Sequence, residues 1–191
     1  GAGSIVSDAH LPAYEQNNLP VIGLYDPDYE KAKALGQKFN ISVFKDPAEA
    51  AAIQNCIFDL AIPPSAHHKV LELIPENSAV ILQKPMGSNL SEASNILTLC
   101  RKKSLNACVN FQLRFAPMMI ALKDIINKGL IGEIVDIDMW AALDTPWNLW
   151  KFLEDLPRVE ILLHSIHYFD AIRFLVGNPH GVHAKTMGHP A

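Results

Sequence analysis

A carboxylate and two histidines are spaced so that they would share one face of a helix. Glu160, His164 and His167 stand at positions i, i+4 and i+7, and residues at these spacings lie on the same side of an α-helix. Histidine exchanges a proton near neutral pH, and a carboxylate one turn away can orient it. The same trio could ligate a metal. Acid–base chemistry, metal ligation and a polar stripe without chemistry therefore all stay open.

A pair of glycines opens the chain, as Gly1-Ala2-Gly3, before a predicted helix. Such a pair lets the backbone approach a pyrophosphate, which then lies at the helix N-terminus. The third glycine of the usual pattern is replaced by Val6. Asp26 ends a predicted strand, where an acidic side chain can bind the ribose 2′-OH of NAD. The alternatives are an expression scar for the glycines and a helix cap for Asp26.

Three further groups of residues could either take part in binding or catalysis or have a purely structural role. Lys84 follows a predicted strand, where ligands bind in open α/β sheets, although a loop lysine is more often simply solvated. His67 and His68 open a helix after another strand, and we expect one of them to face a cleft. Three tryptophans lie close together in the sequence, Trp140, Trp147 and Trp150. Their indole rings would either pack against the C–H groups of a sugar or cover a core or an oligomer contact.

Short apolar runs alternate with helical patterns through the first half of the chain. Strands are predicted at residues 21–25, 42–44, 57–62, 80–82 and 107–109, and helices at 28–39, 47–53, 65–74 and 91–103. Strands without polar alternation are typical of sheets covered on both faces, and this order predicts a doubly wound parallel α/β sheet. Residues 1–110 are therefore interpreted as a dinucleotide-binding domain.

The pattern changes after Asn110. Helices are predicted at residues 116–128, ending at Gly129, and at 158–176, ending at Gly177, because helices often stop at a glycine. Strands are predicted at 133–142 and from 181, with a loop rich in Trp and Pro between them. Residues 111–191 are interpreted as the start of a second, α+β domain.

Composition excludes several classes of protein. Hydrophobic residues make up 49% and charged residues 19%, as in ordinary folded globules, and the formal net charge is −4. The longest basic run is Arg101 to Lys103, too short for a nucleic-acid surface. Apolar runs are too short for a membrane helix. The three cysteines fit neither zinc nor disulfides, which favours buried thiols in a reducing, cytoplasmic compartment.

Motifs along nearly the whole chain, taken together and in order, resemble the glucose–fructose oxidoreductase/inositol dehydrogenase family, Gfo/Idh/MocA. GAGSIVSDAHLPAY is similar to the family's glycine loop and following helix, and IPPSAHH to the segment that borders the nicotinamide. QKPMGSNLSEA is similar to the family's Glu-Lys-Pro motif, and VNFQLRFAP to the stretch after the last Rossmann strand. GLIGEIVDIDMW resembles the entry into the second domain, and HSIHYFD the catalytic helix.

The resemblance implies a Rossmann-type fold and hydride transfer between a nicotinamide dinucleotide and a secondary hydroxyl of a sugar or polyol. NAD is expected, with NADP as the other possibility, and no metal. Cofactor binding is implied for Gly1, Gly3, Ser4, Ile5, Asp26, Pro63, His67 and Lys84. Catalysis is implied for Lys84, His164 and His167, and substrate binding for these three with Asn110, Arg114 and Trp147.

Three departures from the family pattern carry consequences. Leu163 replaces the family aspartate, so His164 or Glu160 is expected to substitute for it. Gln83 replaces the glutamate of the lysine motif, which should leave Lys84 less strongly paired. The chain begins inside the glycine loop and ends as the second sheet starts, so the full protein is expected to be longer and homo-oligomeric. The altered positions leave an alternative function open, a non-catalytic dinucleotide- or sugar-binding regulator.

Overall fold

The computed structural model describes residues 1–145 and 159–185. The chain divides into two compact units. Among the described residues, the first unit comprises residues 1–110 and 159–162, and the second comprises residues 111–145 and 163–185. Within the described ranges, no helix combines the length and the apolarity that a membrane crossing requires.

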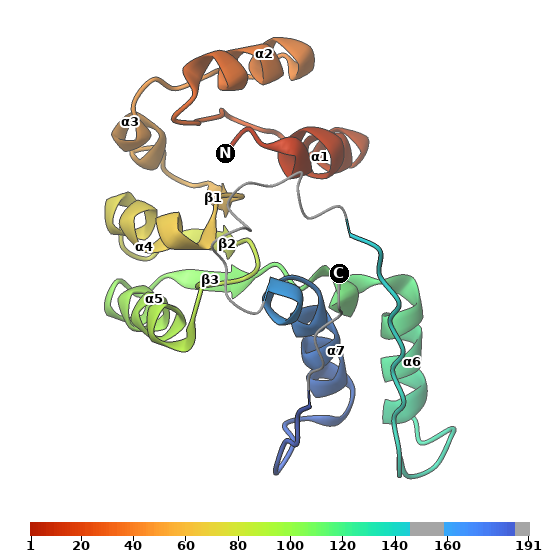
Figure 1. Cartoon of the computed structure of the whole chain (residues 1–191). Coiled ribbons are helices and arrows are strands. Elements are labelled where there is room, and N and C mark those ends of the chain that lie inside the picture. Colours follow the sequence, from red (N-terminus) through yellow and green to blue (C-terminus); the bar gives the residue numbers. More distant parts are fainter. Residues whose placement is uncertain (146–158, 186–191) are drawn as a thin grey trace. The chain divides into compact units, whose positions relative to one another are not determined.

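A parallel sheet lies at the centre of the first unit. Its strands, in the spatial order β1-β2-β3, are β1 (Ile57–Leu60), β2 (Ala79–Leu82) and β3 (Asn106–Val109) (Figure 1). Leu60 pairs with Leu82, and Leu82 pairs with Val109, so all three strands end level with one another. The prediction of a parallel α/β sheet is confirmed, and the carboxyl ends of its strands form one edge.

Two crossover helices cover one face of this sheet and lie side by side in Figure 1, namely α4 (Pro64–Leu73) and α5 (Leu90–Lys102). Their apolar side chains pack on the strands because an amphipathic helix must bury one face. Each fully buried leucine or isoleucine contributes roughly 1.5–3 kcal/mol. The core of this layer consists of Leu60, Leu71, Ile74, Val80, Leu82, Ile96 and Cys100.

Side chains cap the N-termini of helices in the first unit. Asn89 accepts from the Glu92 backbone at 2.9 Å, and Glu92 in turn accepts from the Ser88 backbone at 2.7 Å, which satisfies two free N–H groups at the start of α5. Asp46 caps α3 (Pro47–Ala51). Asn40, with φ of 54°, ends α2 (Tyr29–Phe39) in the left-handed conformation that asparagine tolerates.

The glycine loop leads into a helix that begins as η1 (Val6–His10), a π-type turn, and continues as α1 (Leu11–Gln16). Beside it, the predicted strands at residues 21–25 and 42–44 reduce to a single parallel bridge between Leu24 and Val43. The prediction of two strands was wrong here because a strand needs consecutive backbone partners, and among the described residues this pair finds only that bridge.

The regular elements of the second unit, among the described residues, are helices. It contains η2 (Gln112–Phe115), α6 (Pro117–Asn127) and α7 (Ile166–Val176), and the turn η5 (Ile161–Ser165) leads into α7. The predicted helices at 116–128 and 158–176 are therefore confirmed over their described parts. Gly177, with φ of 90°, ends α7 in a conformation that few residues other than glycine adopt.

Two predicted strands of the second unit do not form in the described residues. Residues 133–142 and 181–185 have no strand pairing, and the side chains of Val135 and Trp140 are each 93% exposed. Their alternating sequence suits a sheet, but sheet formation requires a neighbouring strand, which residues 1–145 and 159–185 do not supply. For a similar reason β3 is largely exposed instead of buried, since it forms an edge of the three-stranded sheet.

Candidate functional site

The two glycines at the start of the chain occupy different environments. A Cβ added to Gly1 would lie 2.2 Å from the Ala61 carbonyl oxygen, so only glycine lets this loop pack against the end of β1. A Cβ on Gly3 would meet no described atom within 4 Å, so its face of the loop is open. Ser4 and Ile5, both exposed, follow at the N-terminus of the helix. Backbone N–H groups at such a helix start suit an anionic group.

Asp26 fixes the backbone beside this loop with both of its carboxylate oxygens. Oδ2 accepts from the Ala2 N–H at 2.7 Å, and Oδ1 accepts from the Asp28 N–H at 2.9 Å. The cap of α2 is Asp28, which accepts from the Lys31 backbone at 3.2 Å. The alternative that Asp26 itself caps the helix was therefore wrong, and its carboxylate lies half-buried at the glycine loop.

Three of the expected site residues follow the ends of the three parallel strands. Pro63, Lys84 and Asn110 come shortly after β1, β2 and β3. The strand ends stay in register past the strands themselves, because Gln83 N–H donates to Leu60 O at 3.2 Å and Asn110 N–H donates to Leu82 O at 2.8 Å. Ligands bind at this edge in open α/β sheets.

Lys84 is half-buried in the turn that follows β2. Burial lowers the pKa of its amine, because removal from water disfavours the charged form. An amine with a lowered pKa gives up its proton more readily, and perturbed groups of this kind are concentrated at functional sites.

A series of side-chain contacts connects this turn to the helix after the glycine loop. The Lys84 backbone N–H donates to Gln83 Oε1 at 3.0 Å, and Gln83 Nε2 lies 3.2 Å from His10 Nε2. His10 Nδ1 lies 2.6 Å from Asp59 Oδ2, which also accepts from the Tyr14 hydroxyl at 2.9 Å. Burial raises the pKa of Tyr14, so its hydroxyl stays a donor.

None of these contacts was expected from the sequence. The available signal was Asp59, a carboxylate inside an otherwise apolar strand, since buried carboxylates are almost always paired. His10 was recognised only as part of a family motif, and Tyr14 carried no signal. Gln83 was expected to affect the pairing of Lys84, and the structure shows a different contact, to the Lys84 backbone N–H.

His67 belongs to the core, and His68 to the surface. The His67 ring has 0% exposure, and its nitrogens lie 3.0 Å from Met86 O and 3.4 Å from Leu60 O. We therefore assign His67 to holding the loop after β2 against the end of β1, instead of contacting the cofactor. Burial lowers the pKa of this imidazole. His68 is exposed and lies 3.7 Å from the Glu72 carboxylate.

In the second unit, Arg114 is engaged by a buried carboxylate. Its Nε and Nη2 donate to the two oxygens of Asp170, each at 2.6 Å, and Asp170 is 4% exposed. The hydrogen bond to Asp170 raises the pKa of the guanidinium, and Arg114 Cζ lies over the Phe174 ring, 5.3 Å from its centre. This bidentate pair joins η2 to α7, so any substrate contact of Arg114 would come in addition to a structural one.

The expected catalytic histidines lie at the start of α7. His167 is 7% exposed, and the Phe111 ring meets its imidazole edge-on at 6.0 Å with an interplanar angle of 86°. His164 is half-buried and Leu163 is buried, both in the π-type turn η5. Among residues 1–145 and 159–185, no three carboxylate, histidine or cysteine side chains come close enough to hold a metal, so Glu160, His164 and His167 do not form such a group.

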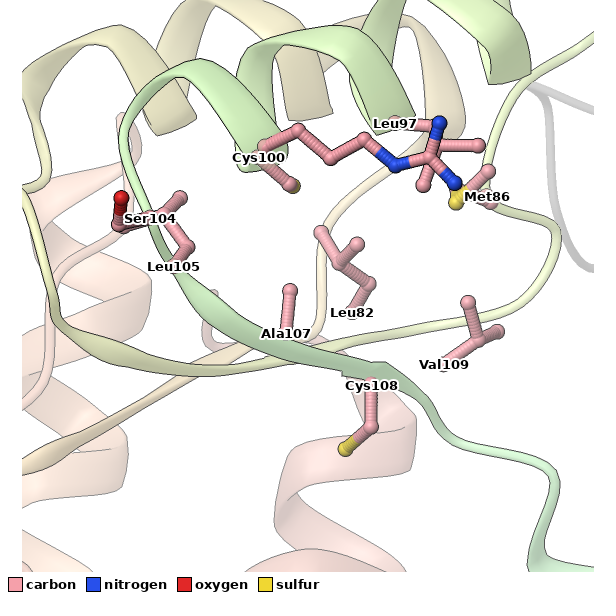
Figure 2. Close-up of a pocket in the computed structure, with 10 residues that line it drawn as sticks. Leu82, Met86, Leu97, Cys100, Ser104, Leu105, Ala107, Cys108 and Val109 are labelled. Atoms are coloured by element: carbon pink, nitrogen blue, oxygen red, sulfur yellow. The ribbon is translucent and has the colours of Figure 1, made fainter.

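The remaining sequence candidates lie elsewhere. Trp147 and Trp150 are outside the described residues, and Trp140 is exposed. A cavity of about 270 Å³ lies between α5 and β3. Figure 2 shows the side chains that line it. Its lining is mainly apolar, with Leu82, Leu97 and Leu105 among the side chains, and it includes none of the expected site residues. The candidate site is therefore the strand-end edge and not this cavity.

The chain is similar in sequence to known oxidoreductases. The chain is 26% identical over 186 residues to D-apiose dehydrogenase of Paraburkholderia graminis, covering 93% of this chain and 48% of that protein. The chain thus spans about half the length of this curated relative.

Solved structures show the same fold. An oxidoreductase from Agrobacterium radiobacter in complex with NAD+, L-tartaric acid and magnesium superimposes with a TM-score of 0.75, at 24% identity, over 93% of this chain and 53% of the other. The super-repressor mutant of Gal80p from Saccharomyces cerevisiae also superimposes with a TM-score of 0.75, at 18% identity, over 91% of this chain and 50% of the other. Residues 1–111 match the family model described as the oxidoreductase family with an NAD-binding Rossmann fold. The chain belongs to this family, Gfo/Idh/MocA.

Proposed function

We propose that the complete protein interconverts a secondary hydroxyl of a sugar or polyol and the corresponding ketone by hydride transfer, with NAD as the redox partner. The observation that carries this proposal is the arrangement at one edge of the sheet. An open glycine loop, the Asp26 carboxylate and the half-buried Lys84 amine all belong to the same unit. Membership of an NAD-binding oxidoreductase family gives this edge its expected occupant.

The residues of the first unit suit the dinucleotide. Gly3 leaves space for a pyrophosphate, and the first N–H groups of the following helix, from Ser4 and Ile5, would donate to it. Each Asp26 oxygen accepts one backbone hydrogen bond and keeps a lone pair for a ribose hydroxyl. A carboxylate would repel a 2′-phosphate, which favours NAD over NADP. Pro63 would border the nicotinamide.

The chemistry would be divided between an amine and an imidazole. Oxidised nicotinamide, when bound, would supply the acceptor for the hydride of the substrate C–H bond. His167 would accept the hydroxyl proton, so that the alcohol becomes a ketone. Lys84 would stabilise negative charge on the reacting oxygen. His164 would support His167, with Asn110, Arg114 and Trp147 contacting the rest of the substrate. In the reverse direction the same groups return the proton.

The names of the similar proteins support this class of substrate. One is a dehydrogenase of D-apiose, a sugar, and one was solved with L-tartaric acid, a small molecule with secondary hydroxyls. These properties belong to those proteins, and they make sugars, polyols and hydroxy acids the substrates to test first.

A regulator that binds ligand without turnover is the competing function. The super-repressor form of Gal80p has the same fold, and two motif positions of this chain, Gln83 and Leu163, depart from the family pattern. Catalysis is favoured because Lys84 and His167, the two groups required for proton and charge handling, are both present.

A substrate panel separates the two functions. The full-length protein is mixed with NAD or NADP and a series of sugars, polyols and hydroxy acids, and reduction of the nicotinamide is followed by its absorbance. Turnover with at least one secondary alcohol, lost in Lys84→Ala, is the expected result. Tight dinucleotide binding by calorimetry without turnover on any member of the panel, in either direction, would establish the regulator instead.

A further inference from the structure

The side chains of Asp59, His10 and Gln83 connect the helix after the glycine loop to the backbone of Lys84. All four residues belong to the first unit. The contacts measure 2.6 Å from Asp59 to His10, 3.2 Å from His10 to Gln83 and 3.0 Å from Gln83 to the Lys84 backbone N–H. The His10 and Asp59 side chains are 11% and 20% exposed, so both are largely shielded from water.

The groups at the two ends of this series of contacts, the Lys84 N–H and the Asp59 carboxylate, determine the direction of every hydrogen bond in the series. The backbone N–H of Lys84 can only donate, so the atom of Gln83 that faces it must be the amide oxygen. The Gln83 NH₂ group then faces His10 and donates to Nε2, which must carry no proton. At the other end, the Asp59 oxygen accepts from the Tyr14 hydroxyl as well, and an ionised carboxylate only accepts. Nδ1 of His10 must therefore carry the proton.

Other protonation states of His10 lose a hydrogen bond. An imidazole protonated on Nε2 would place a lone pair against the Asp59 carboxylate and two donors against each other at Gln83. A doubly protonated ring would also oppose its Nε2–H to the Gln83 NH₂ group. If the Gln83 amide turned over to relieve that clash, its NH₂ group would face the Lys84 N–H. A donor that is shielded from water and has no acceptor is unfavourable, so these alternative states are disfavoured.

We propose that Asp59, His10 and Gln83 are positioning residues that hold the Lys84 turn, with His10 kept as the neutral imidazole protonated on Nδ1. The assignment of Lys84 to catalysis rests on the proposed function, and the protonation state of His10 does not. Gln83 is the decisive residue, because a glutamate at this position could still accept from the Lys84 N–H but could not donate to His10. The Gln83→Glu change would instead require a doubly protonated ring.

The first test measures the imidazole nitrogens directly. The full-length protein is labelled with ¹⁵N-histidine, and the ring signals are recorded by NMR at pH 7, with His10 identified by the signal that His10→Asn removes. The expected spectrum shows His10 with a protonated Nδ1 and an unprotonated Nε2. A proton on Nε2, alone or together with Nδ1, would overturn the proposal. In Gln83→Glu both nitrogens should be protonated, and an unchanged neutral ring would show that Gln83 does not set this state.

The second test measures what the chain of contacts does for Lys84. Gln83→Glu keeps the acceptor for the Lys84 N–H, whereas Gln83→Leu is similar in size and removes it. We expect kcat to fall by roughly 10- to 100-fold more in Gln83→Leu than in Gln83→Glu, with KM for NAD nearly unchanged, because a small misplacement of a reacting group has effects of this size. Equal kcat in the two variants would contradict the positioning role.

Controls separate positioning from general loss of structure and from failure of the proposed function. His68→Gln removes an exposed histidine that pairs only with Glu72 among the described contacts, and it should change neither the His10 signals nor kcat. If the complete protein turns over no substrate, the labelling rate of the Lys84 amine by an acylating reagent replaces kcat. That rate should rise in Gln83→Leu relative to Gln83→Glu, and equal rates would reject the role. Should Gln83→Leu fail to fold, the wild-type spectrum still decides the protonation state of His10.

Discussion

The backbone N–H of Ala2 donates a 2.7 Å hydrogen bond to Oδ2 of Asp26, which ties the middle of the glycine loop to the segment after Leu24. The same carboxylate is the proposed partner of the NAD ribose, so one side chain would shape the loop and select the cofactor. Both oxygens already accept backbone N–H groups, which keeps the carboxylate in one orientation before any ligand binds.

Asp26→Asn should weaken NAD binding and reduce the preference of the protein for NAD over NADP. Asparagine has one acceptor oxygen where aspartate has two, so the variant loses an acceptor for either the backbone or the ribose. A hydrogen bond to a charged group contributes about 1.5–3 kcal/mol. We expect roughly a tenfold to hundredfold loss of NAD affinity by calorimetry, with a smaller loss for NADP. Asp28→Asn is the matched control, because asparagine caps a helix as well as aspartate does. Wild-type NADP binding as tight as NAD binding would refute the role given to Asp26.

Arg114→Ala should destabilise the second unit. Asp170 is 4% exposed and loses both hydrogen bonds in this variant, and a buried acceptor left without its partner costs about 1–3 kcal/mol or more when it is charged. Lys128→Ala is the control, since its exposed pair with Asp124 should contribute at most about 1 kcal/mol. Denaturant unfolding of the full chain measures both. Unchanged stability in Arg114→Ala would show that the ion pair is dispensable and that Arg114 is held for another purpose.

His67 should make the stability of the fold depend on pH. Burial lowers its pKa below the ordinary value of 6.5, so the unfolded chain binds more protons than the folded one as pH falls through that value. The neutral ring is therefore fully stabilising above about pH 7 and becomes less so below 6.5. The stability difference between wild type and His67→Gln should shrink as the pH is lowered from 7 to 5. A pH profile of stability for His67→Gln that runs parallel to that of the wild type would count against this prediction.

Local patterns in the sequence predicted the helices well and the long-range contacts poorly. The helix at Pro117–Asn127 ends before Gly129 because stop signals are local, and the apolar β2 strand is recognisable from its own residues. Residues 133–142 also alternate like a strand, yet strand formation depends on a partner that local sequence does not specify. The Gln83–His10 contact joins residues 73 positions apart. Only the carboxylate of Asp59 within its apolar strand indicated that a partner was required.

The last prediction concerns the two residues that the proposed chemistry requires. Lys84 lies at the carboxyl edge of the sheet in the first unit, and His167 is buried at the start of α7 in the second. General acid–base groups contribute ~10²–10⁴-fold, so His167→Ala should lower kcat by about that factor while NAD affinity stays nearly constant. Lys84→Ala should lower kcat and also raise KM, because the amine would contact the substrate in both the ground and transition states.

His164→Ala decides how the missing family aspartate is replaced. Leu163 is buried and apolar, so it cannot orient an imidazole, whereas His164 is half-buried one residue further on. If His164 orients His167, its loss should lower kcat nearly as much as His167→Ala, and the double variant should be little worse than either single one, because residues that act as a unit are not additive. Steady-state kinetics of the four variants on one accepted substrate measures this. Wild-type kcat in His167→Ala would place the acid–base group elsewhere, and additive losses in the double variant would show that the two histidines act independently.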